Sequence, residues 1–452
     1  MTEPQLTVTG GAGGIDARYE DLDLLASHSD EVSSFLASVS QECHSALVDP
    51  NVLASAVLNP GGVARFEAAL LSALDGPNGM TALAAGFGLR AAALRTVVTA
   101  YQVTDEAQAQ AIESLRWTLG FALSQNLPTV IPLLVGLGVP IAAYELAGGD
   151  IDWQRLITDH PGVVDLVVGA SPGLITGLGI PTLDVTGAAG MLGAFYPDGS
   201  PVVADLGVDI DPRAAKPPEG FADLMRSLDY RNGLSNAEHP DQIDVRTIRH
   251  ADGSTAYIVD IPGTKAWGMP GEFSPYLNDL GTNIHVMAGD TTTREVAIAD
   301  ALRRAGASPT DPVMLIGHSQ GGMVAAQAAH DSANGNFDFN VTHVVTAGSP
   351  IGTTDVPANV QVLSLENSHD IVPHLDAADN PDRPNRTNVT FDTQTGSIGN
   401  NHGTNTAYVP AAEALDRSND PSVTTYRDSA SAFLGAPGTT VQTNVYELTR
   451  VP

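Results

Sequence analysis

The chain has 452 residues, of which 43% are hydrophobic and 16% are charged, and its formal net charge is −31. This length is sufficient for two or three hydrophobic cores, and the composition excludes a wholly disordered chain. The acidic balance argues against nucleic acid and anionic membrane surfaces as partners, because both attract basic proteins. Cys43 is the only cysteine, which excludes an intramolecular disulfide and a multi-cysteine metal site.

The first residues lack the basic segment and the apolar run of a cleavable signal peptide. We therefore expect the protein either in the cytoplasm or exported by a route that uses no cleaved signal. Residues 1–14 end in Thr-Gly-Gly-Ala-Gly-Gly and are predicted to form a flexible lead-in.

Apolar residues recur at helical spacing through the first quarter of the chain, over 15–47, 63–74, 80–101 and 105–123. An Asn-Pro-Gly-Gly segment at 59–62 interrupts this pattern. The pattern predicts a helical N-terminal domain, residues 1–127.

This region loosely resembles the helical hairpins of type VII secretion substrates. Tyr19 and Asp23 have the Tyr-x-x-x-Asp spacing of that route's signal, although they lie in the first predicted helix and the usual Trp-x-Gly turn is absent. The resemblance implies export without a cleaved signal and a helical partner for the N-terminal domain.

An apolar region follows the predicted helices. Residues 117–144 carry no charge, and Gly, Pro and aliphatic residues are frequent over 128–200. A transmembrane helix needs roughly 20 continuous apolar residues, and Pro128, Pro132 and Pro140 interrupt this run. We therefore expect no integral membrane span, and we interpret residues 128–215 as an apolar connecting or cap region.

Short apolar strands alternate with helical segments in the remainder of the chain, residues 216–452. The predicted strands are 244–249, 255–261, 313–316, 342–346, 360–365 and 388–391, and the predicted helices include 293–306 and 407–415. The first two strands are predicted to form a β-hairpin. The alternation that follows predicts an α/β fold with a mostly parallel sheet covered by helices on both faces.

The strongest motif is Gly317-His318-Ser319-Gln320-Gly321, between the strand 313–316 and an Ala-rich helical segment. In such an elbow the serine stands on a sharp turn, and glycine two positions before and after it leaves the necessary room. The following helix directs its free N–H groups at the reacting centre. We predict Ser319 as a nucleophile and expect His318 to point away from the site.

A serine nucleophile needs a carboxylate and a histidine, which in this architecture follow it in that order. Asp370 follows the predicted strand 360–365, where the acid belongs, and we prefer it to Glu366, Asp376 and Asp379.

For the base, His402 comes after the next predicted strand and before the helix 407–415. His369 and His374 flank the acid too closely to be held by it from across the site, and they remain the alternatives. His343 begins a predicted strand and is interpreted as a structural or surface residue.

The reaction also needs two N–H donors for the tetrahedral oxyanion. One is the backbone N–H of Gln320, the residue after the nucleophile. The other is expected on the loop Pro262-Gly263-Thr264, where glycine lets the backbone approach closely and the Thr264 N–H is the candidate.

These motifs resemble the lipase-like α/β hydrolases, including the class 3 lipases, over about residues 220–452. Gly-His-Ser-Gln-Gly-Gly corresponds to their serine elbow, Asp370-Ile-Val-Pro373 to their acid loop, His402 to their C-terminal histidine, and Pro-Gly-Thr…Trp to their oxyanion loop. The resemblance implies an α/β-hydrolase fold. Gln320 stands where those lipases usually have Leu, and Pro262 precedes the oxyanion glycine, which leaves the substrate open.

The leading hypothesis is a serine hydrolase that cleaves a lipid or other small-molecule carboxylic ester through an acyl-enzyme on Ser319. The first alternative is acyl transfer by the same triad to an alcohol. The second is an exported protein that binds partners through its helical N-terminus. No metal-site or cofactor motif occurs in the sequence, so we expect neither a metal nor a cofactor.

Overall fold

The computed structural model describes residues 4–12, 19–76, 79–92, 94–95, 117, 168–169, 171–173, 176, 181–234, 241–267, 271–393 and 395–452. The chain divides into two compact units, one of residues Ile15–Glu113 and one that combines Met1–Gly14 with Ser114–Pro452. The predicted boundary between residues 127 and 128 and the predicted helix 105–123, apart from Trp117, lie outside the described residues.

The smaller unit is helical, with α1 (Tyr19–His44), η1 (Ser45–Val48), α2 (Pro50–Leu58), α3 (Pro60–Asp75) and a further helix over 80–92. The Asn-Pro-Gly-Gly segment begins α3: the Asn59 side chain accepts the Gly62 N–H, and Pro60 occupies the first turn. The Ser33 hydroxyl donates to the Ala84 carbonyl at 2.7 Å, so α1 packs along the last helix.

The larger unit is built on a nine-stranded sheet with the strand order β1-β8-β7-β6-β5-β4-β3-β9-β2. The strands are β1 (Leu6–Gly10), β2 (Ser200–Val208), β3 (Gln242–Arg249), β4 (Thr255–Ile261), β5 (Pro312–His318), β6 (Asn340–Ala347), β7 (Gln361–Asn367), β8 (Arg386–Phe391) and β9 (Thr440–Val451). Strands β4 to β8 are mutually parallel, and the other pairings are antiparallel.

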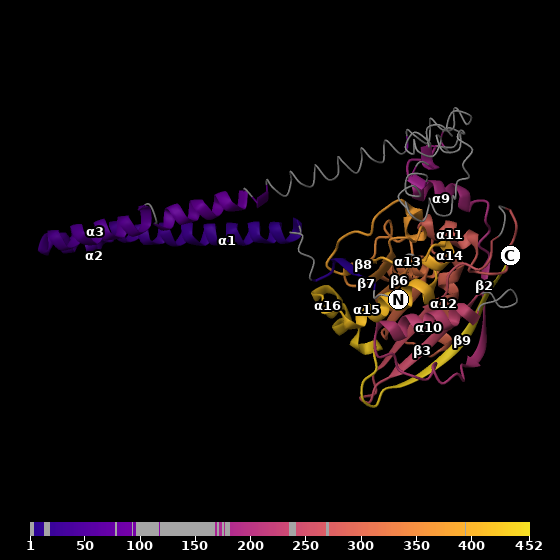
Figure 1. The fold of residues 1–452 in the computed structure, drawn as a ribbon. Coiled ribbons are helices and arrows are strands. Elements are labelled where there is room, and N and C mark those ends of the chain that lie inside the picture. The colour runs from indigo at the N-terminus through magenta and orange to yellow at the C-terminus, as the bar shows by residue number, and fades with distance from the viewer. Residues whose placement is uncertain are drawn as a thin grey trace. The chain divides into compact units, whose positions relative to one another are not determined.

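Helices cover both faces of this sheet (Figure 1). One face packs against α11 (Leu280–Met287), α12 (Thr293–Arg304) and α13 (Gln320–Asn334), and the other against α10 (Phe221–Leu234), α15 (Val409–Arg417) and α16 (Pro421–Ser429). Residues Val313 to Ile316 of β5 are all fully buried because the central strands have a helical layer on each side. The predicted α/β class, with a helical region before it, is confirmed.

The edges of the sheet differ from expectation. Residues 6–10, predicted as part of a flexible lead-in, form β1, which pairs antiparallel with β8 from Leu6 opposite Phe391 to Gly10 opposite Thr387. The Gly10 carbonyl also accepts the Ser422 hydroxyl at 2.8 Å. Residues 200–208, predicted as part of a connecting or cap region, form β2 beside β9. The prediction of a flexible lead-in was therefore wrong for residues 6–10, because this strand exists only through pairing with a partner some 380 residues away in the chain.

No helix within the described part of the chain is long and apolar enough to cross a membrane. Most of the uncharged stretch 117–144 lies outside that part, so the expectation for it stays a prediction.

A buried ionic cluster lies under α10, where Asp244 and Asp260 stand directly opposite each other on β3 and β4. Arg231 pairs with Asp244 and Arg246 pairs with Asp260, each at 2.7 Å, and all four side chains are at most 4% exposed. Burial raises the pKa of Asp244 to about 6, although Arg231 opposes the shift. The folded protein therefore holds a proton on Asp244 at pH values where the unfolded chain has released it.

Asp244→Asn tests this linkage. The raised pKa means that the contribution of Asp244 to stability is greatest below the unfolded pKa and declines as the pH rises through about 6. The asparagine variant lacks this decline, so its unfolding free energy relative to the wild type should improve by about 1–3 kcal/mol between pH 4 and pH 8. Urea unfolding at both pH values measures the difference, with Asp338→Asn, the same change at an exposed side chain, as the control. Parallel pH dependence in the Asp244 variant and the wild type would contradict the prediction.

Candidate active site

The elbow residue Ser319 joins the end of β5 to the start of α13 with φ 55° and ψ −124°. Among the described non-glycine residues, only Ala377 shares a positive φ with it, and this backbone region is costly for an L-residue. A Cβ on Gly317 would lie 2.1 Å from the Gly321 carbonyl carbon, and a Cβ on Gly321 would lie 2.0 Å from the Ile261 carbonyl oxygen. The sequence Gly-x-Ser-x-Gly therefore lets the turn close with the serine at its apex.

Asp370 and His402 meet across two loops. Asp370 follows β7, His402 follows the short helix α14 (Ile398–Asn401), and His402 Nδ1 lies 2.7 Å from Asp370 Oδ2. Because a carboxylate only accepts, His402 carries its proton on Nδ1, which leaves Nε2 free to act as a base. Asp370 is fully buried and the His402 side chain is 20% exposed.

Two further donors fix the Asp370 carboxylate. The Tyr408 hydroxyl donates to Oδ2 at 2.5 Å, and the Val372 N–H donates to Oδ1 at 3.0 Å. Burial and the adjacent Asp370 charge raise the pKa of Tyr408 well above its usual value, so the hydroxyl keeps its proton. Tyr408 lies at the end of the π-helical turn η3 (Thr404–Tyr408), and sequence reasoning did not identify it.

The loops that carry Asp370 and His402 are joined by neighbouring asparagines. Asn367 Nδ2 donates to the Asn401 carbonyl at 2.9 Å, and Asn401 Nδ2 donates to the His369 carbonyl at 3.1 Å. These two hydrogen bonds fix the loop of Asp370 relative to the loop of His402.

The alternative acids and bases have other partners. The Asp376 carboxylate accepts backbone N–H groups, including that of Gly352 at 2.7 Å. Glu366 lies on β7 and accepts from Asn380. His369 Nε2 lies 3.1 Å from Asp392. The structure thus brings Asp370, rather than these carboxylates, to His402.

The expectation that His318 points away from the site is wrong. Its ring lies against that of His402, with centroids 4.4 Å apart, and its Nε2 donates to the His402 carbonyl at 2.7 Å. Burial, and then the neighbouring His402, hold the pKa of His318 well below its usual value, so it stays neutral. The alternation of side chains along β5 could have predicted this orientation. Met314, Ile316 and His318 lie on the same face of the strand, and Tyr408 packs on that face.

The predicted oxyanion loop lies against Ser319. A Cβ on Gly263 would lie 2.9 Å from Ser319 Cβ, so only glycine allows the loop to come this close. The next residue, Thr264, is held through its side chain by Asn283, whose Nδ2 donates to Thr264 Oγ1 at 3.0 Å.

With Ser319 in its predicted role as nucleophile, Gly263→Ala should lower kcat by about 10- to 100-fold, because an added methyl displaces either the loop or Ser319. Ester hydrolysis kinetics measure the loss. Gly233→Ala is the matched control, since a Cβ there meets nothing within 4 Å. Equal activity of Gly263→Ala and the wild type would mean that the loop does not position the reacting groups.

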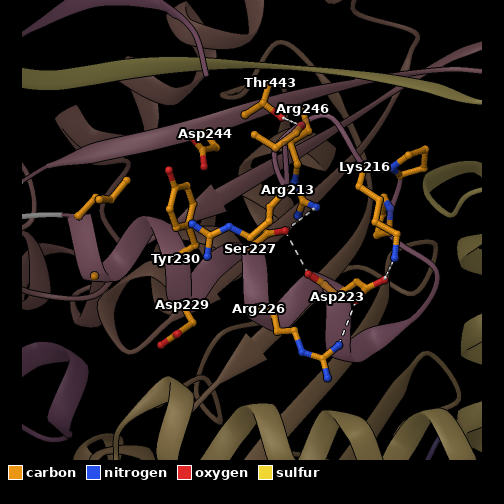
Figure 2. A pocket seen from close by; sticks show the side chains of 15 residues that line it. Arg213, Lys216, Asp223, Arg226, Ser227, Asp229, Tyr230, Asp244, Arg246 and Thr443 are labelled. Carbon is orange, nitrogen blue, oxygen red and sulfur yellow. Dashed lines mark hydrogen bonds and ion pairs between the residues drawn. The ribbon is translucent and has the colours of Figure 1, made fainter. Parts of the chain in front are cut away.

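A cavity of about 560 Å³, whose lining does not include Ser319, lies between α10 and strands β3 and β9 (Figure 2). Its cationic lining residues are each paired with a carboxylate: Arg213 with Asp211, Lys216 with Glu219, Arg226 with Asp223, and Arg246 with Asp260. Asp229, which also lines the cavity, accepts the Thr404 hydroxyl two residues after His402. The charges that line this cavity are thus largely neutralised within the protein. In the described ranges, no group of three or more His, Cys, Asp or Glu side chains is arranged to hold a metal ion.

Residues 272–428 match the family model of the PGAP1-like alpha/beta domain. This PGAP1-like segment covers about a third of the chain and includes the elbow, the acid loop and the histidine loop. The searches of curated proteins and of solved structures gave no significant match.

The PGAP1-like domain is of the lipase-like α/β-hydrolase type, and the mostly parallel sheet flanked by helices is consistent with that fold. At the level of the family, the match supports a lipase- or esterase-like hydrolase. The Gly263 loop precedes the PGAP1-like segment, so its placement against Ser319 comes from the structure alone.

Proposed function

We propose that the protein is a serine hydrolase that cleaves a carboxylic ester, with Ser319 as nucleophile, His402 as general base and Asp370 as the acid that orients it. The observation that carries the proposal is the 2.7 Å bond between His402 Nδ1 and the fully buried Asp370. The strained backbone of Ser319 and the Gly263 loop beside it support the same roles.

In the proposed reaction, His402 Nε2 takes the Ser319 hydroxyl proton as the oxygen attacks the ester carbonyl carbon. The backbone N–H groups of Gln320 and Thr264 stabilise the oxyanion that forms. Collapse expels the alcohol, which receives the proton from His402, and leaves an acyl group on Ser319. Water, activated by His402, then releases the carboxylic acid and restores the serine.

Asp370 holds the imidazole in the tautomer that the reaction requires and stabilises the imidazolium that forms. Tyr408 and the Val372 N–H keep the carboxylate in place. His318, which stays neutral and donates to the His402 carbonyl, contributes no positive charge beside the base.

Labelling with a fluorophosphonate, followed by mass-spectrometric mapping of the modified residue, tests the proposal. We expect one label per chain, on Ser319, together with hydrolysis of short p-nitrophenyl esters. A folded sample that takes no label, or takes it on another serine, would overturn the proposal. Added alcohol distinguishes the two fates of the acyl-enzyme, because a transferase yields a new ester where a hydrolase yields the free acid.

A further inference from the structure

Arg294 on α12 connects the two backbone segments that carry the proposed oxyanion donors. One guanidinium nitrogen donates to Gln320 Oε1 at 2.7 Å, and the other donates to the Pro262 carbonyl at 3.0 Å. Gln320 supplies one proposed N–H donor, and Pro262 lies two residues before the other, Thr264. A single planar group therefore spans both sides of the proposed oxyanion hole.

The guanidinium is neutralised within the protein. Arg294 and Asp241 are both 0% exposed, and Arg294 donates to Asp241 Oδ1 at 2.7 Å. Asp241 is itself fixed, because its carbonyl accepts the Leu448 N–H of β9 at 2.8 Å. A buried charge is stable only when its partners are in place, so this pair resists any movement of Arg294.

The Gln320 side chain is occupied at both ends. It is 1% exposed, and its Nε2 donates to the Asp279 carbonyl at the start of α11 at 2.6 Å, while its Oε1 accepts from Arg294. With neither amide atom free, this side chain is not available to a substrate. Glutamine at a position where the resembling lipases have leucine is thus accounted for by contacts inside the protein.

The two segments that Arg294 joins are also in close backbone contact. A Cβ on Gly321 would lie 2.0 Å from the Ile261 carbonyl oxygen and 2.8 Å from that of Pro262. Small shifts of α13 relative to the loop that follows β4 would therefore change the distance between the backbone N–H groups of Gln320 and Thr264. Because such donors act through distances near 3 Å, their spacing decides how well they stabilise the oxyanion.

We propose that Arg294 is a positioning residue for the oxyanion hole, acting through the Gln320 side chain and the Pro262 carbonyl, and that Gln320 serves this brace and not substrate recognition. This inference rests on the proposed function of Ser319. Arg294 itself touches no reacting atom; its role is to hold two backbone N–H groups at a fixed separation.

The test compares Arg294→Met, Gln320→Met and the double variant with the wild type, with kcat for a p-nitrophenyl ester expressed per active site titrated with fluorophosphonate. We expect each single variant to lower kcat per site about 10- to 100-fold, with KM changed less than about threefold. Affinity for a boronic acid that places an oxygen in the oxyanion hole should fall by a similar factor. A purely structural role would instead reduce the number of titrated sites and leave kcat per site unchanged.

The double variant tests whether the two side chains act through one contact. If they do, it should lose little more activity than Arg294→Met alone, which already removes the contacts with both Gln320 and the Pro262 carbonyl, whereas independent roles would multiply the losses of the two single variants. Arg304→Met, on the exposed side of the same helix and paired with Asp300, is the control and should keep wild-type kcat. Gln320→Met leaves the Arg294–Asp241 pair intact, so it tests the inference even if Arg294→Met does not fold.

Wild-type kcat per site in a folded Gln320→Met variant would contradict the positioning role of Arg294 and Gln320. The proposed function of Ser319 would be unaffected by that result. Absence of both labelling and ester turnover in the wild type would instead overturn the proposed function.

Discussion

Replacement of Ser319 by alanine is expected to lower kcat for a p-nitrophenyl ester by about 10⁴- to 10⁶-fold, because Ser319 is the proposed nucleophile and alanine has no hydroxyl to form the acyl-enzyme. The backbone conformation at this position, with φ 55°, is set by the elbow, and alanine has the same Cβ. We therefore expect the variant to keep the wild-type circular dichroism spectrum and thermal midpoint. Steady-state kinetics and fluorophosphonate labelling measure the loss.

The control for this variant is Ser308→Ala, at an exposed serine between α12 and β5. It should retain wild-type turnover and take one label. Undiminished turnover in folded Ser319→Ala would show that the nucleophile is another residue, and the mechanism would then be wrong at its first step.

Asp370→Asn is expected to lower kcat by about 10³- to 10⁴-fold with little change in KM. The asparagine amide can donate to His402 Nδ1, and the ring would then present its proton at Nε2 where the reaction needs a lone pair. The neutral side chain also cannot stabilise the imidazolium. The remaining carbonyl oxygen, at the Oδ1 position, can still accept the Val372 N–H, and the Tyr408 hydroxyl, which faces the same position as His402, can accept from the amide, so the loop should keep its structure.

Asp379→Asn provides the comparison for Asp370→Asn, because it makes the same change at an exposed aspartate further along the same loop. Steady-state kinetics of both variants should show full activity for the Asp379 variant and loss for the Asp370 variant. The reverse result would assign the orienting role to Asp379 and would contradict the 2.7 Å pairing of Asp370 with His402.

Local patterns predicted most of the α/β unit. The hairpin β3–β4, the buried strand β5 and the strands β6 to β8 were expected within a few residues of their bounds, because hydrophobic runs and turn residues are signals that neighbours in the chain provide. The elbow at Ser319 could also be predicted from the sequence, because a sharp turn there requires glycine two residues before and two residues after the serine.

The edge strands were decided by long-range pairing. The segment Leu6–Gly10 is short and adjoins a glycine-rich stretch, so its local pattern favours a loop, and it becomes a strand only by completing the hydrogen bonds of β8. The strand β9 likewise has its place between β2 and β3 through partners far apart in the chain. Such pairings depend on the assembled sheet and leave little trace in a short window.

The sequence by itself was sufficient to predict the elbow around Ser319, the order of serine, acid and histidine, and the loop at Gly263. Only the tertiary structure decided that His318 lies on His402, that Tyr408 donates to Asp370, and that Arg294 joins Gln320 to Pro262. The physical reason is separation along the chain: a turn is specified by adjacent residues, whereas a buried hydrogen bond between distant segments forms only where the packed layers bring its two ends together.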